Sequence, residues 1–263
     1  MSGGDSKLKR GKLDISPDEA SDFAGVAAAL GFLDNRTNVE AMRPANVDVA
    51  RVFTLDRMRA LMAALGEPQR SYKCVHVAGS KGKGSVCEMV ASSLEACGYT
   101  VGLYTSPHLV DIFERVRINQ MKITAADFSS VLSRVARAEA TIDTLLGPAT
   151  YFELLTACAL VHFADQAVDL AVIEVGLGGL TDATNIIMPE VSAIAAIHKE
   201  HTNILGTTLA EIAAAKAGIL KPGVPGVTVP QVPEVMQVLR AAATAAGTTL
   251  EALGEEIEYS ARV

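Results

Sequence analysis

The sequence predicts an α/β fold in which a mostly parallel sheet is flanked by helices and carries a phosphate-binding loop. Three observations lead to this prediction. Short, nearly continuous apolar runs, such as residues 169–175, have the composition of strands that are buried on both faces. These runs alternate with longer helical segments, which is typical of a sheet covered by helices. One run enters a glycine-rich turn that opens directly into a helical segment.

The elements are expected in the following order. Residues 1–16 are expected to be a disordered tail, and Ser16 with Pro17 signals the start of a helix that runs to about Leu30. Residues 34–52 are loop-like. The later helices are expected at about 55–65 (ended by Gly66), 83–96 (ended by Gly98), 125–145, 152–164, 209–217 and 232–246. The strands are expected at about 74–78, 100–104, 169–175, 191–197 and 226–229, with another strand or turn beginning near the end of the chain.

The composition narrows the class of protein. The chain has 263 residues, of which 49% are apolar and 20% charged, as in a soluble globular protein with a sizeable core. Its net charge of -7 argues against a nucleic-acid partner, because phosphate neutralisation needs a basic surface. No stretch has the length of a membrane span or the pattern of a signal peptide. The four cysteines, all within apolar runs, are expected to be buried free thiols, so we expect a cytoplasmic protein.

The glycine-rich turn is the strongest candidate for a functional site. It consists of Gly79, Ser80, Lys81, Gly82, Lys83, Gly84 and Ser85. The glycines allow backbone N–H groups to point at an anion, and the following helix adds its positive end. Lys83 can reach the terminal phosphates of ATP, and the Ser85 hydroxyl can contact phosphate or Mg²⁺. The alternative reading is a flexible turn with a solvated lysine.

Two later residues suggest a metal site. Glu174 ends an apolar strand beside a second glycine-rich turn, where open α/β sheets bind ligands, and its carboxylate is a natural Mg²⁺ ligand. It could equally be a solvent-facing residue. His201 also follows a strand, but a lone histidine is more often structural. Lys216, in an alanine-rich helix, reads as an exposed lysine.

The sequence around the turn, HVAGSKGKGSV, resembles the HVAGTNGKGS loop of folylpolyglutamate and dihydrofolate synthases, which are relatives of the Mur peptide ligases. Four further blocks are similar to motifs of that family, and together the similarity spans about residues 55–223. These blocks lie at 103–119 (LYTSPHL and ERVRIN), 151–157 (YFELLTA), 174–185 (EVGLGG and DATN) and 200–219 (EHT, LG and KAGI).

The resemblance assigns roles to individual residues. It implies ATP and two Mg²⁺ ions as cofactors, and a lysine at position 216 that can be carbamylated. The implied catalytic residues are Lys83, His201 and Lys216. The nucleotide would contact residues 79–85 and Asn185. The metal ligands would be Ser85, Ser106, Glu174 and His201, and the substrate would contact Ser106, Pro107, His108, Arg117 and Phe152.

The chain departs from the family pattern at three places. Ser80-Lys81 replaces Thr-Asn in the phosphate loop, and Leu180-Thr181 replaces Arg-Leu after the second set of glycines. Glu200 replaces the aspartate before the histidine, which moves the carboxylate by one methylene. Extra positive charge at Lys81 or Lys199 could compensate for the missing arginine.

The implied reaction is ATP-dependent addition of L-glutamate to dihydropteroate or a folate through an acyl phosphate. Residues 17–263 are expected to form a Mur-ligase-like ATP-binding domain that is incomplete at its C-terminal end, with the glutamate-ligase domain missing. The chain alone, expected to be a monomer, should then bind nucleotide weakly and catalyse poorly. The alternatives are a Mur-type cell-wall peptide ligase, a non-catalytic nucleotide-binding module that needs a partner chain, and a phosphohydrolase.

Overall fold

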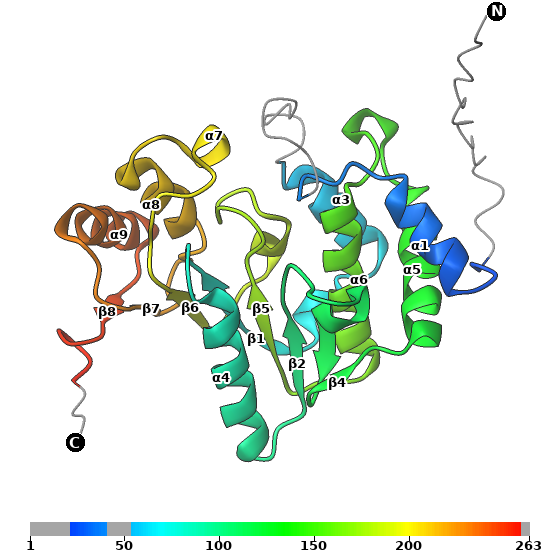
Figure 1. The fold of residues 1–263 in the computed structure, drawn as a ribbon, viewed down its shortest axis with the longest axis horizontal. Helices are drawn as coiled ribbons and strands as arrows, with labels where there is room; N and C mark the ends of the chain where they lie inside the picture. The colour runs from blue at the N-terminus through cyan, green and yellow to red at the C-terminus, as the bar shows by residue number, and fades with distance from the viewer. Residues whose placement is uncertain (1–21, 41–53, 259–263) are drawn as a thin grey trace, which may run out of the picture.

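A mixed eight-stranded sheet runs through the computed structural model, which describes residues 22–40 and 54–258 (Figure 1). The strand order is β4-β3-β2-β5-β1-β6-β7-β8. The strands are β1 (Lys73–Ala78), β2 (Val101–Tyr104), β3 (Val116–Ile118), β4 (Met121–Lys122), β5 (Leu170–Glu174), β6 (Val191–Ile194), β7 (Gly226–Thr228) and β8 (Leu250–Ala252). Strand β1 lies between β5 and β6 and is parallel to both. The predicted α/β fold with a mostly parallel sheet is therefore confirmed.

The antiparallel edge of the sheet was not predicted. Strand β3 pairs antiparallel with β2, and β4 pairs antiparallel with β3. Asn119 and Gln120 form the turn between β3 and β4, and both have left-handed φ values, 45° and 63°. Such two-residue turns match the twist of a hairpin. Because this short segment contains charged residues, a search for apolar runs does not detect it.

The helices lie at the predicted positions, except that α7 was not predicted and three helix ends differ. They are α1 (Val26–Asp34), α3 (Asp56–Ala64), α4 (Lys83–Ala96), α5 (Ala125–Glu139), α6 (Tyr151–Asp165), α7 (Thr202–Leu205), α8 (Leu209–Ala217) and α9 (Pro233–Ala246). Short 3₁₀ turns are η3 (Pro68–Arg70), η4 (Ile112–Arg115), η5 (Thr144–Leu146) and η6 (Ala183–Ile186). The predicted tail and the start signal at Ser16 lie outside the described residues, as does most of the predicted loop 34–52.

Three predicted helix boundaries are wrong. Helix α1 continues to Asp34 instead of ending at about Leu30. Residues 22–25 are not helical, because Gly25 has φ 141°, a value outside the helical region, and α1 begins only after it. Helix α5 ends at Glu139 instead of continuing to residue 145. The Thr141 hydroxyl donates to the Ala138 carbonyl, and the Asp143 carboxylate accepts from the backbone N–H of Leu145. These short polar side chains compete with the helical hydrogen bonds.

Alternation along the strands builds a core on each face of the sheet. Val77 and Val172 pack with Cys87 and Ala91 of α4 on one face. Cys74 of β1 and the two neighbours of Val172, Ala171 and Ile173, pack with α5 and α6 on the other face. Helices α8 and α9 cover β6 to β8. Figure 1 shows α4 in front of the sheet, with α5 and α6 beside β2 and β4 and α8 and α9 at the opposite end.

The cysteine prediction holds for three residues. Cys74, Cys87 and Cys158 are buried free thiols, but Cys97 is exposed. It is the residue that caps the C-terminal end of α4, where the helix leaves the sheet, so its apolar neighbours do not cover it. None of the helices in the described ranges 22–40 and 54–258 is long and apolar enough to cross a bilayer.

Candidate functional site

The phosphate loop joins the carboxyl end of β1 to the N-terminus of α4, as predicted. Gly82 has a left-handed φ of 83° and starts the helix, so Lys83, Gly84 and Ser85 form its first turn. The backbone N–H groups of a first helical turn have no partner within the helix, and they carry the positive end of the helix dipole. This turn can therefore receive an anion.

Part of the expected cradle is already occupied by internal hydrogen bonds. The backbone N–H groups of Ser80 and Lys81 both donate to the Ala196 carbonyl, at 2.9 and 3.1 Å. The Ser80 hydroxyl donates to the His198 carbonyl at 2.9 Å. The first half of the loop is thus pinned to the segment after β6, and the anion-facing donors come from residues 82–85. This distribution differs from a loop in which every N–H points at the phosphates.

Gly79 is required by two independent constraints. Its φ is 146°, and a Cβ atom there would lie 2.8 Å from the Ala195 Cβ. We expect Gly79→Ala to destabilise the protein by about 1–3 kcal/mol, since both strain and overlap must be relieved. Chemical denaturation measures this, with Gly98→Ala as the control, because Gly98 has φ 91° and open space around it. Equal destabilisation of the two variants would show that relieving the overlap with Ala195 costs little free energy.

Glu174 and Lys83 meet beneath the loop. The Lys83 Nζ lies 4.0 Å from Oε1 of Glu174, and their side chains are 17% and 5% exposed. The backbone N–H of Ser106 donates to Oε2 of Glu174 at 3.0 Å. A Cβ at Gly84 would lie 3.8 Å from that oxygen, so the carboxylate faces the first turn of α4. Burial raises the pKa of Glu174, although the Ser106 N–H and Lys83 oppose the shift.

Lys216 is buried, which overturns the plain reading of an exposed helix lysine. Its Nζ donates to the Gly79 carbonyl at 2.9 Å and pairs with Oε1 of Glu200 at 2.8 Å. Burial lowers the pKa of the Lys216 ammonium, and the hydrogen bond to Glu200 offsets part of this. The pKa of Glu200 is raised by burial but lowered further by Lys216, so it ends below its usual value. Lys216 therefore ties α8 to the start of the phosphate loop.

The second glycine-rich loop, residues 176–181, is held by Asp182. This buried carboxylate accepts from the backbone N–H groups of Leu177 and Thr184, at 2.8 and 3.0 Å. The Thr184 hydroxyl donates to it at 2.5 Å and lies 2.8 Å from Nε2 of His76. Sequence reasoning missed this role, although an Asp two residues before a Thr at the start of a short helix is a recognisable cap.

Asn185 does not face the phosphate loop through its amide donors. Its Nδ2 donates to the carbonyls of Leu180 and Gly218, at 2.9 and 3.0 Å, so it joins the second glycine-rich loop to the end of α8. Among the described residues its Oδ1 is buried without a partner. The predicted contact of Asn185 with nucleotide stays a prediction.

The predicted substrate residues fall into two groups. Ser106, Pro107 and His108 lie on the loop after β2, and the Ser106–Pro107 peptide bond is cis. Phe152, in the first turn of α6, packs against Gly176, where a Cβ would come within 2.4 Å of its ring, and lies 6.0 Å from the Tyr104 ring. Phe152 and Tyr104 lie on the same face of the sheet, because both belong to the core beneath α6.

Arg117 lies apart from this group. It is opposite Leu103 in the β2–β3 register, and Leu103 faces α4. Its guanidinium accordingly bonds to Glu88 of α4. Sequence reasoning instead missed Arg115, a buried residue whose Nε donates to Nδ1 of His108 at 2.9 Å. The motif contains both arginines, and only the structure shows that Arg115 ends η4 beside the loop while Arg117 lies in β3.

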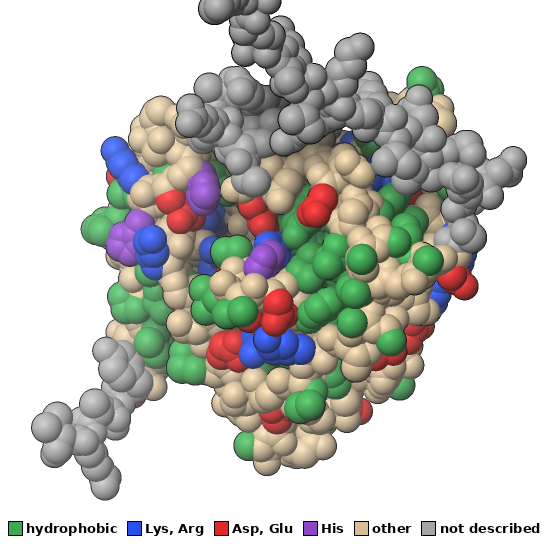
Figure 2. Space-filling view, turned by 45° about the vertical axis from the view of Figure 1, so that its right-hand side comes forward, with side chains coloured by type: hydrophobic (Ala, Val, Ile, Leu, Met, Phe, Trp, Pro, Cys, Tyr) green, Lys and Arg blue, Asp and Glu red, His purple; other side chains and the backbone are tan. Residues whose placement is uncertain are grey.

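In the described ranges, His201 does not belong to a group of potential metal ligands. It is exposed, has a left-handed φ of 46°, and precedes α7. Within residues 22–40 and 54–258, no group of three or more His, Cys, Asp or Glu side chains is arranged to hold a metal. Figure 2 shows histidine, basic and acidic side chains gathered near one another on one face, beside an area of hydrophobic side chains.

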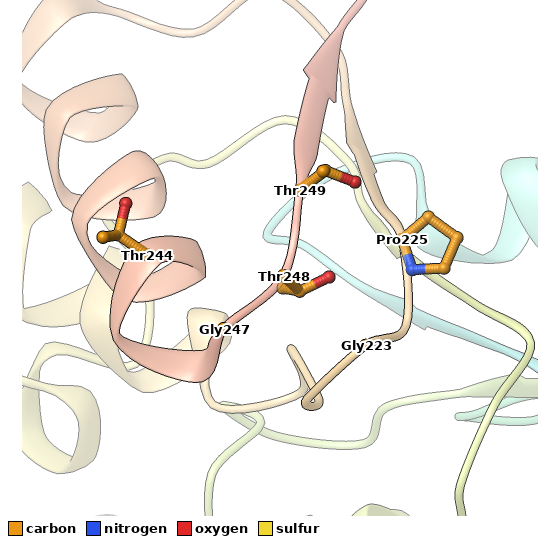
Figure 3. Close-up of a pocket in the computed structure, with 6 residues that line it drawn as sticks. All are labelled: Gly223, Pro225, Thr244, Gly247, Thr248 and Thr249. Atoms are coloured by element: carbon orange, nitrogen blue, oxygen red, sulfur yellow. The ribbon is translucent and has the colours of Figure 1, made fainter.

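A separate pocket lies at the other edge of the sheet (Figure 3). It is lined by Gly223, Pro225, Thr244, Gly247, Thr248 and Thr249. These residues precede β7 and β8 or end α9, so they lie at the amino ends of the strands. Ligands of open α/β sheets bind at the carboxyl ends. The pocket is therefore not part of the site around Lys83.

Comparison with known proteins places this geometry in a family. Residues 77–256 match the family model of the Mur ligase middle domain. The dihydrofolate synthase/folylpolyglutamate synthase of Bacillus subtilis is 42% identical over 173 residues, which cover 65% of this chain and 40% of that protein. The enzyme of the same description from Mycobacterium tuberculosis is 43% identical over 175 residues, covering 64% of this chain and 36% of that protein.

Comparison with solved structures leads to the same family. The Mycobacterium tuberculosis folylpolyglutamate synthase complexed with ADP superposes with a TM-score of 0.78 at 37% identity, covering 90% of this chain and 52% of that one. E. coli FolC in complex with DHPP and ADP gives a TM-score of 0.77 at 32% identity, covering 89% and 52%. The chain thus spans about half the length of these solved structures and two fifths or less of those two curated relatives. It belongs to the Mur ligase middle-domain family, in the branch of the folylpolyglutamate and dihydrofolate synthases.

Proposed function

We propose that this chain is the ATP-binding part of an ATP-dependent ligase that adds L-glutamate to dihydropteroate or to a folate. The observation that carries the proposal is the buried group formed by Lys83, Glu174 and the Ser106 N–H at the N-terminus of α4. A cation, a carboxylate and the N–H groups of a first helical turn are together suited to binding a triphosphate. Solved relatives in complex with ADP, with DHPP and ADP, and with AMPPCP and folate support this reading.

The reaction that we propose has two steps. The substrate carboxylate attacks the γ-phosphorus of ATP, which gives an acyl phosphate and releases ADP. The amine of glutamate then attacks the acyl carbon, and phosphate leaves as the amide forms and the amine loses a proton. Phosphoryl transfer needs mainly positioning and neutralisation of charge. Lys83 and the first turn of α4 supply both.

The residues present fit one Mg²⁺ ion. Glu174 offers a hard carboxylate oxygen whose buried charge is only partly balanced by Lys83, and Ser85 and Ser106 can add hydroxyl oxygens. Magnesium is commonly held by one or two carboxylates together with substrate phosphates. When bound, the ion would neutralise phosphate charge. A second ion at His201 is proposed on the family resemblance alone.

Carbamylation of Lys216 is a further part of the proposal. Burial lowers the pKa of the lysine, which favours the neutral amine that reacts with CO₂. The ion pair with Glu200 favours the ammonium instead. The two effects oppose each other, so the state of Lys216 must be measured. Mass spectrometry that finds no carbamate on Lys216 in bicarbonate would count against the modification.

On the substrate side, Phe152 offers an aromatic ring for a flat pterin, and His108 lies on the neighbouring loop. We propose that Ser106, Pro107 and His108 line this side of the site. Adenine and glutamate contacts are proposed to come from a second domain, since the chain spans about half of its solved relatives.

The test is calorimetric titration of the chain with a non-hydrolysable ATP analogue, with and without Mg²⁺. We expect binding that is weak and strengthened by Mg²⁺, because phosphate contacts dominate the described site. Ligase activity is then assayed after adding the C-terminal domain of a relative as a separate chain. Nucleotide binding without restored activity would favour a non-catalytic module. Activity on a cell-wall precursor in place of folate would favour a Mur-type peptide ligase.

A further inference from the structure

The ring of His108 is oriented by a single hydrogen bond whose direction is known. The Nε of Arg115 donates to Nδ1 of His108 at 2.9 Å. An arginine Nε–H is always a donor, so Nδ1 must be the acceptor. A neutral imidazole carries one N–H group, which then has to be on Nε2. The contact therefore selects one of the two neutral tautomers of His108.

Arg115 cannot easily turn away from this contact. Its side chain is 2% exposed, and Glu40 accepts from both Nη1 and Nη2, at 2.9 and 2.5 Å. Its guanidinium carbon lies 5.7 Å from the centre of the Tyr151 ring. A two-point pair of arginine with carboxylate fixes the plane of the guanidinium. Two segments, one after α1 and one at the start of α6, thus hold the Nε–H of Arg115 toward His108.

The loop that carries His108 is also held. The Glu114 carboxylate accepts from the backbone N–H groups of Leu109, Val110 and Asp111, at 2.8, 3.3 and 3.3 Å. These contacts hold the Glu114 carboxyl in its charged form and lower its pKa to about 2. The backbone after His108 is therefore anchored over three successive residues, which limits rotation of the loop about the histidine.

The other ring nitrogen is free for a ligand. Nε2 of His108 makes no hydrogen bond to any residue in the described ranges, and the side chain is half-buried. His108 follows Ser106 by two residues, and Ser106 contacts Glu174 through its backbone N–H. Tyr151, beneath Arg115, is the neighbour of Phe152. His108 is thus linked to both groups of proposed ligand contacts, through its own loop to Ser106 and through Arg115 and Tyr151 to Phe152.

We propose that Arg115 is a positioning residue that keeps His108 as an Nε2–H donor, so that the substrate must offer a hydrogen-bond acceptor there. Suitable acceptors are a carbonyl oxygen or an unprotonated ring nitrogen of a folate-type heteroaromatic acid, and an N–H group would be rejected. This specificity rests on the proposed function, whereas the tautomer itself does not depend on it.

The tautomer is measured by long-range ¹H–¹⁵N NMR of the full chain labelled on histidine, with the His108 signals assigned from their loss in His108→Gln. We expect a pyrrole-type Nε2 and a pyridine-type Nδ1 in the wild type. In Arg115→Lys, which keeps a cation for Glu40 but lacks the Nε–H, the two forms should mix. A wild-type His108 protonated on Nδ1, or already mixed, would overturn the proposal.

Specificity is measured by titrating folate in the presence of the ATP analogue. His108→Gln keeps an N–H donor at the position of Nε2, whereas His108→Met has nearly the same shape without a donor. We expect Gln to bind folate about as well as the wild type and Met to bind about 3- to 10-fold more weakly, the value of one neutral hydrogen bond. Thermal melting of each variant checks folding.

Equal weakening in the two variants would overturn the donor role. No binding of folate by the wild type would overturn the folate-type ligand and the proposed substrate together. In that case the NMR result still decides whether Arg115 sets the tautomer.

Discussion

Replacing Lys83 by alanine is expected to weaken binding of a non-hydrolysable ATP analogue by roughly 30- to 3,000-fold. Removing one member of a desolvated, hydrogen-bonded charge pair costs about 2–5 kcal/mol, and each 1.4 kcal/mol is a factor of ten. The Lys83 side chain is 17% exposed and lies 4.0 Å from the Glu174 carboxylate, so little water can replace its charge. In the variant, Glu174 would also repel the incoming phosphates. Calorimetric titration measures the change directly.

Lys81→Ala is the matched control, because Lys81 lies in the same loop but its side chain is exposed. It should weaken binding by no more than a few fold, since exposed charges are screened. Equal losses for the two lysines would mean that the loop attracts nucleotide only by its general charge. An unchanged affinity in Lys83→Ala would remove the phosphate site from the proposal.

Glu174→Gln is expected to change stability and nucleotide binding in opposite directions. Without Mg²⁺ the variant should melt at a higher temperature than the wild type at neutral pH. With Mg²⁺ it should lose most of the increase in nucleotide affinity that the ion gives the wild type. The physical reason for both is that Glu174 is a buried carboxylate whose charge is only partly balanced until a cation arrives.

The sign of the stability effect follows from linkage. Burial raises the pKa of Glu174 in the folded protein above its unfolded value, so the folded state binds more protons in the interval between them. Stability therefore falls as the pH rises through that interval, and the loss persists above it. Glutamine carries no charge, so its variant should show no such loss. Below the unfolded pKa of glutamate the difference between the two proteins should vanish.

Thermal melts from mildly acidic to neutral pH in a chelator, followed by nucleotide titrations with added Mg²⁺, measure both effects. Glu88→Gln is the control, because Glu88 is also near the loop but is 43% exposed and pairs with Arg117. Lower stability of Glu174→Gln at neutral pH would show that the contacts with Lys83 and Ser106 outweigh burial. A full Mg²⁺ effect in that variant would place the ion elsewhere.

Local signals in the sequence determined most of the framework. The apolar runs of β1 and β5 and the caps of α4 and α8 are encoded in consecutive residues, so the predicted and observed bounds of these two helices agree. The phosphate loop was found for the same reason, because its glycines, lysine and serine are contiguous. Motif blocks then pointed to the family that the comparison confirms.

Only the tertiary structure decided which polar side chains meet. Lys216 read as an exposed helix lysine, yet it reaches Gly79, 137 residues earlier in the chain. Arg115 and Arg117 are separated by one residue, but Arg115 ends the 3₁₀ turn η4 beside His108, whereas Arg117 lies in β3 and faces α4. Patterns of consecutive residues specify the local conformation and the face of a helix or strand that is buried, because they act through residues that are neighbours in the chain. The partner of a buried charge depends instead on strand order and register, which bring distant segments together.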